Sequence, residues 1–265
     1  MARSVAMILG SLILVGVMLF ALVRHDRQIQ SSERLLVYCA ATHREAMDEV
    51  RRDYEDKTGH VVDLQYGPSQ TLLSNLLLSR QGDLYIPADS LFLQLAEQQA
   101  LIREQCLLAS METVVLVQSG NPQSITSFHD LLREDVRLVL ANDESAAIGR
   151  RLRTSLSSKQ WMSLRNAARG LRGTVTEAAN DVAIGAADAT IVYDVVGRRY
   201  ATLEVLRLEE LAKIRSDVAA GVLRWTRNPE GCQTFLRYLG EPHSGWSVLN
   251  KHGFSGPHPV SSDDV

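Results

Sequence analysis

Small residues, several with hydroxyl groups, follow short apolar runs of the sequence and directly precede segments of helical period. These junctions are residues 40–42, 67–71, 145–149 and 174–176. The first N–H groups of a helix have no acceptor within that helix and lie at the positive end of its dipole. Each junction therefore offers donors that suit an anion. At any single junction, the alternative is that the Ser or Thr side chain only caps its helix.

The segments around these junctions alternate between strand and helix character. Apolar runs typical of buried strands are residues 35–40, 61–66, 83–87, 113–118, 137–141, 189–193 and 218–223. Helical periods cover residues 43–57, 70–80, 89–99, 148–156, 160–168, 176–185, 230–239 and 244–252, with Asp89 as an expected N-cap. This alternation predicts an α/β fold with a parallel or mixed sheet covered by helices. In such sheets, ligands bind at the carboxyl ends of the strands.

The composition limits the class of partner. The chain has 265 residues, a formal net charge of -3 and a pI near 6.2, which gives no support to nucleic-acid binding. A weakly acidic protein must attract an anion with local dipoles rather than with its overall charge. Cys39, Cys106 and Cys232 lie far apart and show no metal-binding spacing. No catalytic motif is found, so we expect neither an enzyme nor a cofactor.

Several of these segments resemble the periplasmic molybdate-binding proteins, which are solute-binding subunits of ABC importers. The matching segments are residues 37–42, 66–72, 82–89, 188–193, 235–239 and 251–254. The resemblance extends from about residue 35 to residue 254. It implies a two-lobed type II periplasmic-binding-protein fold, which the N-terminal transmembrane helix expected from the apolar run over residues 4–23 would precede. Lobe one would comprise residues 34–112 and 220–256, lobe two residues 113–219, and residues 257–265 a loose tail.

In that family, two lobes clamp a tetrahedral oxyanion with neutral donors only. Carried over by position, the implied ligand-binding residues are Thr42, Ser69, Ile148, Val175 and Tyr193, with Ala147 and Gln70 as further candidates. Thr42 and Ser69 would contribute hydroxyl and N–H groups, and Tyr193 its phenolic O–H. Two positions depart from the family pattern, because Thr42 stands where Ser is usual and Ile148 where a small residue is usual. Both departures add bulk beside the implied site.

The resemblance implies capture of molybdate or tungstate outside the cytoplasmic membrane, for delivery to a permease and its ATPase. Two alternatives stay open. One is a binding protein for another small solute, such as sulfate, phosphate or a ferric ion. The other is a membrane-anchored sensor or interaction module with the same fold.

The N-terminus carries an uncharged apolar run over residues 4–23. Twenty residues of helix span about 30 Å, which is enough to cross the bilayer core. The run ends without a good cleavage site, so an uncleaved anchor is favoured over a signal peptide. Residues 1–33 would then form the anchor, or signal segment, and its tether. The rest of the chain would lie on the periplasmic side of the cytoplasmic membrane.

Charged residues beside the junctions have simpler interpretations than ligand binding. His43 is expected on the surface in the first turn of a helix. Arg150, Arg151 and Arg153 are expected to form a solvated face of the helix that begins near Ile148, although they would also draw anions towards the site.

Overall fold

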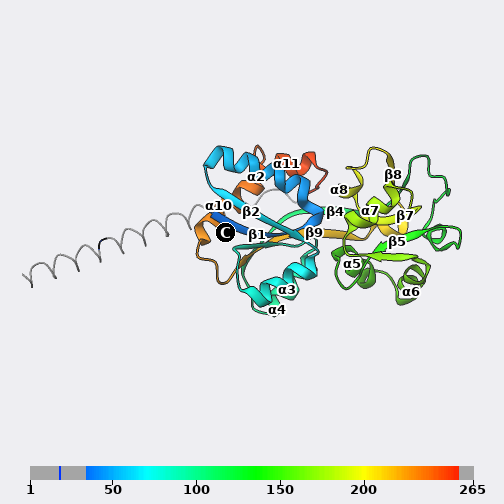
Figure 1. Ribbon diagram of the computed structural model, residues 1–265, viewed down its shortest axis with the longest axis horizontal. Coiled ribbons are helices and arrows are strands. Elements are labelled where there is room, and N and C mark those ends of the chain that lie inside the picture. Colours follow the sequence, from blue (N-terminus) through cyan, green and yellow to red (C-terminus); the bar gives the residue numbers. More distant parts are fainter. Residues whose placement is uncertain (1–17, 19–33, 257–265) are drawn as a thin grey trace, which may run out of the picture.

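The computed structural model describes Met18 and residues 34–256. Residues 34–256 form two lobes lying side by side (Figure 1). The predicted anchor or signal segment over residues 4–23, the tether and the tail over residues 257–265 lie outside the described residues, apart from Met18. Within the described part of the chain, no helix has both the length and the apolar character needed to cross a membrane.

The first lobe is built on three strands, with β1 pairing in parallel with β2 on one side and β3 on the other. Its strands are β1 (Arg34–Ala40), β2 (Val61–Gly67) and β3 (Leu84–Ile86). The connecting helices are η1 (Ala41–His43), α2 (Arg44–Thr58), α3 (Ser69–Ser79) and α4 (Ser90–Gln98), and the chain later returns to this lobe as α10 (Pro229–Gly240) and α11 (Gly245–Lys251). The helices α2, α10 and α11 contact one another and cover one face of the sheet (Figure 1).

The second lobe repeats the scheme, with β5 pairing in parallel with β6 and β7. Its strands are β5 (Leu138–Ala141), β6 (Gly170–Arg172), β7 (Ala189–Tyr193) and β8 (Leu203–Leu206). Its helices are η2 (Phe128–Leu132), α5 (Ala147–Ser155), α6 (Ser158–Ala167), α7 (Val175–Ala183), α8 (Asp194–Gly197) and α9 (Glu209–Ala212).

Two long antiparallel strands, β4 (Ile102–Gln118) and β9 (Arg215–Leu223), connect the lobes. They complete a continuous strand order β2-β1-β3-β9-β4-β7-β5-β6, with β8 pairing to β4. β4 changes its partner from β9 to β7 between Glu112 and Thr113. The predicted lobe boundaries at 112/113 and 219/220 stay a prediction, but the first lies where this change of partner occurs.

The α/β architecture predicted from the sequence is confirmed, whereas several element bounds were wrong or missing. β4 begins at Ile102 and not near residue 113. Its first half contains exposed polar residues at 103–105, so no apolar run marks it, and pairing with β9 makes it a strand. The short elements β6, β8, α8 and α9 were not predicted, because three or four residues are too few to show a period.

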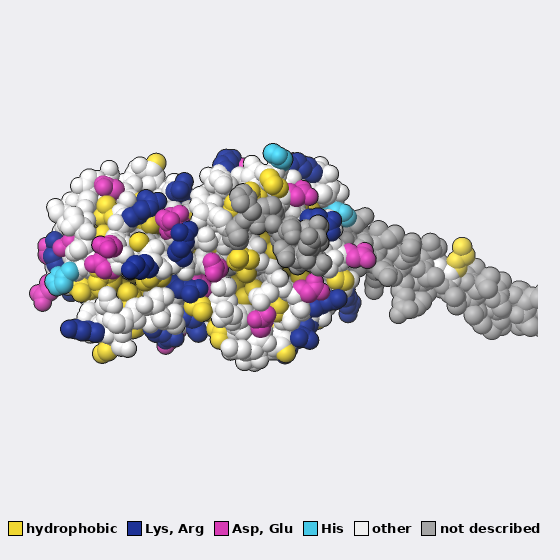
Figure 2. Space-filling model, turned by 180° about the vertical axis from the view of Figure 1, so that it is seen from behind, with side chains coloured by type: hydrophobic (Ala, Val, Ile, Leu, Met, Phe, Trp, Pro, Cys, Tyr) yellow, Lys and Arg dark blue, Asp and Glu magenta, His cyan; other side chains and the backbone are white. Residues whose placement is uncertain are grey.

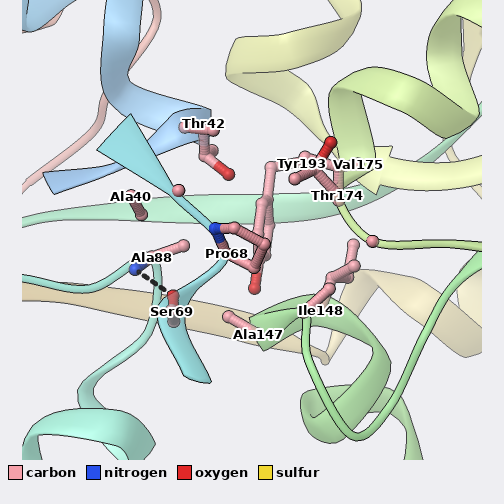
Figure 3. Close-up of a pocket in the computed structure, with 14 residues that line it drawn as sticks. Ala40, Thr42, Pro68, Ser69, Ala88, Ala147, Ile148, Thr174, Val175 and Tyr193 are labelled. Carbon is pink, nitrogen blue, oxygen red and sulfur yellow. Dashed lines mark hydrogen bonds between the residues drawn. The ribbon is translucent and has the colours of Figure 1, made fainter. Parts of the chain in front are cut away.

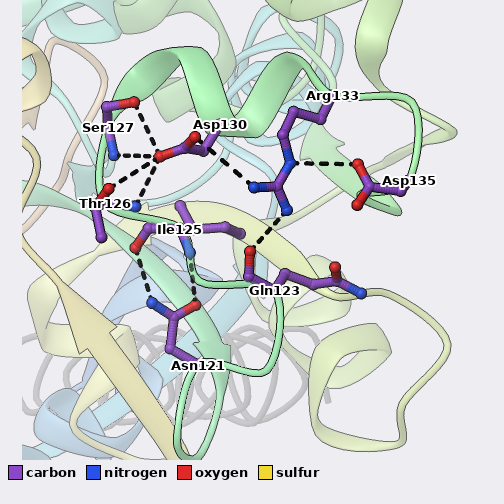
Figure 4. Close-up of polar contacts among 8 residues, drawn as sticks. All are labelled: Asn121, Gln123, Ile125, Thr126, Ser127, Asp130, Arg133 and Asp135. Atoms are coloured by element: carbon purple, nitrogen blue, oxygen red, sulfur yellow. Dashed lines mark hydrogen bonds and ion pairs between the residues drawn. The ribbon is translucent and has the colours of Figure 1, made fainter.

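The long connection from β4 to β5 contains η2, and polar contacts order the chain around this helix (Figure 4). One carboxylate oxygen of Asp130 accepts hydrogen bonds from the N–H groups of Thr126 and Ser127, both at 2.9 Å. These N–H groups, with the Ser127 hydroxyl, lower the pKa of Asp130 to about 2. Arg133 donates to the Gln123 carbonyl at 2.7 Å. Through η2, the connection contacts α6 of the second lobe.

Helix α5 begins unusually close to the chain that follows β5. A Cβ added at Gly149 would lie 2.6 Å from the Ala141 carbonyl oxygen and 2.7 Å from backbone atoms of Asn142 and Asp143. Backbone atoms cannot turn away as a flexible side chain can. Glycine at this position therefore sets how closely the start of α5 approaches the end of β5.

Gly149→Ala is expected to destabilise the fold by about 1–3 kcal/mol, because the added methyl must push α5 away from β5. The sign of this change in stability is informative, because replacing Gly by Ala within a helix otherwise stabilises the fold by roughly 1 kcal/mol. Urea denaturation measures the effect. Gly256→Ala is the control, because a Cβ there meets nothing within 4 Å. Equal or higher stability of Gly149→Ala would contradict the close approach.

Candidate functional site

A small cavity lies between the lobes, where the carboxyl ends of parallel strands from both lobes meet (Figure 3). Its volume is about 20 Å³. Its lining comes from residues at or just after the ends of β1, β2, β3, β5, β6 and β7, namely Ala40, Ala41, Thr42, Gly67, Pro68, Ser69, Ala88, Ala146, Ala147, Ile148, Gly173, Thr174, Val175 and Tyr193. None of these side chains carries a charge at neutral pH.

The first lobe contributes two hydroxyl groups. The Ser69 oxygen accepts a hydrogen bond from the N–H of Ala88 at 3.1 Å, which leaves the Ser69 proton to be donated into the cavity. The Ser69 carbonyl accepts from the Tyr85 hydroxyl at 2.8 Å, so the backbone is also held in place. The Thr42 hydroxyl points towards the cavity (Figure 3). Both groups are therefore positioned to donate to a ligand.

The second lobe contributes the N-termini of α5 and α7. The residue that precedes α5 is Ala146, which has no side chain able to cap the helix. The first N–H groups, at Ala147 and Ile148, therefore lack an acceptor within the helix. α7 is capped by Thr174, whose hydroxyl accepts from the N–H of Glu177 at 3.1 Å and leaves the N–H of Val175 without an acceptor in its own helix. With α3 from the first lobe, three helix N-termini converge on the cavity.

The hydroxyl groups at these junctions differ in whether they act as caps. Thr174 is the N-cap of α7, so the capping interpretation holds there. Ser69 is not a cap, because α3 follows Pro68 and no side chain caps it. Ser145 lies near the start of α5, yet its hydroxyl donates to the Gly173 carbonyl at 3.3 Å. No side chain therefore caps the N-termini of α3 and α5 beside the cavity.

Tyr193 is fully buried, and its ring lies between first-lobe and second-lobe residues of the cavity wall (Figure 3). Burial, together with the charge of Asp89, raises the pKa of Tyr193 well above its usual range. The phenol therefore stays protonated and neutral. Its oxygen lies 3.0 Å from the Ser216 hydroxyl, which in turn lies 2.6 Å from a carboxylate oxygen of Asp89.

The structure brings together most of the residues that the sequence predicted for the site. Thr42, Ser69, Ala147, Ile148, Val175 and Tyr193 all line the cavity. Gln70 does not line it, because its side-chain amide contacts the Ser74 hydroxyl at 3.4 Å, and its backbone N–H donates to the Ser145 carbonyl of the other lobe at 3.2 Å. Ala88 and Gly173 also line the cavity but lie outside the predicted junctions, since neither follows a recognised strand end with a hydroxyl residue beside it.

Two expectations for the neighbouring charged residues were wrong. His43 is buried, at 1% exposure, and its Nε2 lies 3.1 Å from the Pro87 carbonyl oxygen. Arg151 does not belong to a solvated face, because its guanidinium forms a bidentate ion pair with the buried Asp89 at 2.5 and 2.6 Å. The third residue of the predicted face, Arg153, pairs with Asp143 within the second lobe and is partly exposed.

Charged side chains of both signs lie interspersed on the face of the molecule shown in Figure 2. Among the described residues, no cluster of His, Cys, Asp and Glu could hold a metal ion. The electrostatic attraction at the cavity thus comes from N–H and O–H dipoles.

The chain belongs to the family of bacterial extracellular solute-binding proteins, whose sequence model matches residues 35–255. The resemblance noted from the sequence is confirmed by this match and by relatives that are molybdate-binding proteins. The molybdate-binding protein ModA of Mycobacterium tuberculosis is 25% identical over 231 residues, which is 86% of this chain and 87% of that protein.

Solved structures share the fold at low sequence identity. The periplasmic molybdate-binding protein of Azotobacter vinelandii superposes with a TM-score of 0.71 at 16% identity, covering 84% of this chain and 100% of that one. The periplasmic binding protein AfuA of Actinobacillus pleuropneumoniae, with fructose-6-phosphate bound, gives a TM-score of 0.73 at 13% identity, covering 83% and 82%. The α/β fold is thus shared by binding proteins for quite different solutes.

Burial of His43 predicts a specific dependence of stability on pH. Burial and the nearby Arg199 charge lower the pKa of His43 to about 4, against the raising effect of its hydrogen bond to Pro87. The unfolded chain, with a pKa near 6.5, binds more protons between these values, so stability is fully present above pH 6.5 and declines as the pH falls towards 4. The loss at pH 4 is roughly 3 kcal/mol.

His43→Gln removes the titration but keeps an N–H donor for the Pro87 carbonyl. Its free energy of unfolding should change less between pH 6.5 and pH 4 than that of the wild type, measured by urea denaturation at each pH. His129→Gln is the control, because His129 is exposed, and it should keep the wild-type dependence. Equal slopes for His43→Gln and the wild type would show that His43 is not held neutral.

Proposed function

We propose that this protein captures a tetrahedral oxyanion, molybdate or tungstate in the first place, in the cavity between its lobes. The observation that carries the proposal is the lining, which combines three helix N-termini with the hydroxyls of Thr42 and Ser69 and contains no charged side chain. A dianion supplies acceptors for all of these donors at once. Each hydrogen bond to a charged oxygen contributes on the order of 1.5–3 kcal/mol.

The size of the cavity favours a small inorganic ion. A cavity needs about 10–15 Å³ to hold one water molecule, and this one has about 20 Å³. A sugar phosphate such as the ligand of AfuA is far larger. The bulk of Thr42 and Ile148, where the family usually has smaller residues, narrows the same space.

The lining also argues against a ferric ion as the ligand. Hard cations are held by anionic oxygen ligands such as carboxylates. The cavity has no carboxylate in its wall, and its single phenol, on Tyr193, is kept protonated by burial and the charge of Asp89. N–H groups that point into the cavity would repel a cation. The donor chemistry therefore favours an anion over a metal.

Membership of the solute-binding family supports a role of this capture in transport. The partners we propose are the permease and the ATPase of an ABC importer, with the protein on the extracytoplasmic side of the cytoplasmic membrane. The anchor predicted over residues 4–23 would keep it there, or a signal peptide would release it. A sensor or interaction module of the same fold, without a transport role, is distinguished by whether neighbouring genes encode a permease and an ATPase.

Calorimetric titration with molybdate, tungstate, sulfate and phosphate tests the proposed function. Ser69→Ala should weaken the binding of molybdate roughly ten- to a hundredfold, because it removes one donor to a charged oxygen. It also leaves the Ala88 N–H without its acceptor, so a loss of thermal stability is expected as well.

Ser74→Ala is the matched control on the same helix. The Ser74 hydroxyl oxygen lies 3.4 Å from the side-chain nitrogen of Gln70 and does not line the cavity. The affinity of Ser74→Ala for molybdate should therefore equal that of the wild type. Reduced stability of Ser69→Ala with unchanged affinity would reject Ser69 as a ligand-binding residue. Failure of the wild type to bind any of the four anions would reject the proposed function.

A further inference from the structure

Two arginines of the second lobe reach the first lobe close to the cavity, although neither lines it. Arg151, on α5, forms the ion pair with Asp89 at the start of α4. Arg199, which follows α8, donates to the carbonyl oxygen of Thr42 and lies 3.5 Å from Glu45. Both contacts join residues of different lobes, so they exist only when the lobes meet.

The Arg151–Asp89 contact is the more deeply buried of the two. Asp89 is fully buried and the Arg151 side chain is 19% exposed. Asp89 also caps α4 by accepting from the N–H of Leu91 at 2.8 Å. The adjacent Arg150 guanidinium lies 4.9 Å from the centre of the Phe92 ring, which extends the contact between α4 and α5. Burial opposes the charge of Arg151, but its hydrogen bonds to Asp89 and the charge of Asp89 raise its pKa.

The direction of the hydrogen bonds connects this ion pair to the cavity. Ser216 has one proton and lies within bonding distance of both Asp89 and Tyr193. The Asp89 carboxylate can only accept, so Ser216 donates to Asp89 and accepts from the Tyr193 hydroxyl. Without an anion the phenolic proton is thus held by Ser216. An anion is the stronger acceptor and draws the same proton into the cavity.

We propose that Arg151 is a positioning residue of the binding site, which latches the lobes together through Asp89 and, by way of Ser216, holds the Tyr193 hydroxyl at the cavity wall. The inference rests on the proposed function, because it concerns how the captured anion is retained. When the lobes separate, water hydrates both charges. Loss of Arg151 therefore leaves an unpaired buried carboxylate in the closed form and little penalty in the open form. The closed fraction falls, and the apparent dissociation constant rises in proportion.

Three variants test the latch with molybdate as the probe. Arg151→Gln removes the charge, and Asp89→Asn removes the partner charge while keeping a residue that caps helices equally well. Each should weaken binding by about 30-fold or more, mainly through faster release, as expected for loss of one partner of a buried charge pair. The double variant should bind more tightly than either single variant, because it leaves no unpaired charge buried in the closed form.

A merely structural role of Arg151 predicts a different set of results. On that view, Arg151→Gln lowers the melting temperature of the ligand-free protein and leaves affinity and release rate unchanged. The latch predicts the reverse, with a nearly unchanged melting temperature without ligand and a lower one with molybdate. Arg153→Gln is the matched control, because Arg153 lies on the same helix and pairs within its own lobe. It should behave as the wild type does.

A measurement without ligand separates failure of the latch from failure of the proposed function. Spin labels at Leu78→Cys on α3 and Met162→Cys on α6 are exposed and lie on different lobes, in a background with Cys106→Ser. Arg151→Gln should shift the distribution of label distances to longer values than in the wild type or Arg153→Gln. Identical distributions would overturn the latch, even if molybdate binds. If the label distances shift but the protein binds no oxyanion, the latch is retained and the proposed capture of an oxyanion is rejected.

Discussion

The N–H groups at the start of a helix need acceptors from outside that helix, and here three helices begin at one cavity. A buried donor left without an acceptor costs about 1–3 kcal/mol. An acceptor in the cavity would satisfy the donors of these helices that face it while the lobes are together. Parallel strands in both lobes direct these helix N-termini to the same place.

The cavity wall contains no charged side chain, but charged side chains form contacts directly beside it. The second lobe has arginines within reach of the cavity, but Arg151 is bound by Asp89 and Arg199 by the Thr42 carbonyl. A neutral wall of fixed donors distinguishes anions by size and geometry, whereas a free guanidinium would hold many anions. The ion pair instead favours the closed arrangement of the lobes. Recognition and closure are thus carried by different groups, connected by Ser216.

The sequence was sufficient for the α/β class and for most of the cavity wall, because both depend on local pattern. Strand runs and helical periods are local, and so is a small hydroxyl residue at their junction, as at Thr42 and Ser69. The contacts beyond the wall could not be predicted, because they join distant segments. Asp89 and Arg151 are 62 residues apart, and Ser216 lies 127 residues beyond Asp89. His43 is likewise buried by Pro87 and Phe254, which no local period connects to it.

Anomalous X-ray scattering from crystals grown with tungstate tests the central claim most directly, because tungsten is located without reference to the protein. The account predicts one strong peak inside the cavity, with oxygen atoms within hydrogen-bonding distance of the Ser69 hydroxyl and of the first N–H groups of α5 and α7. A peak outside the cavity, or no peak in a protein that binds tungstate in solution, would contradict the account.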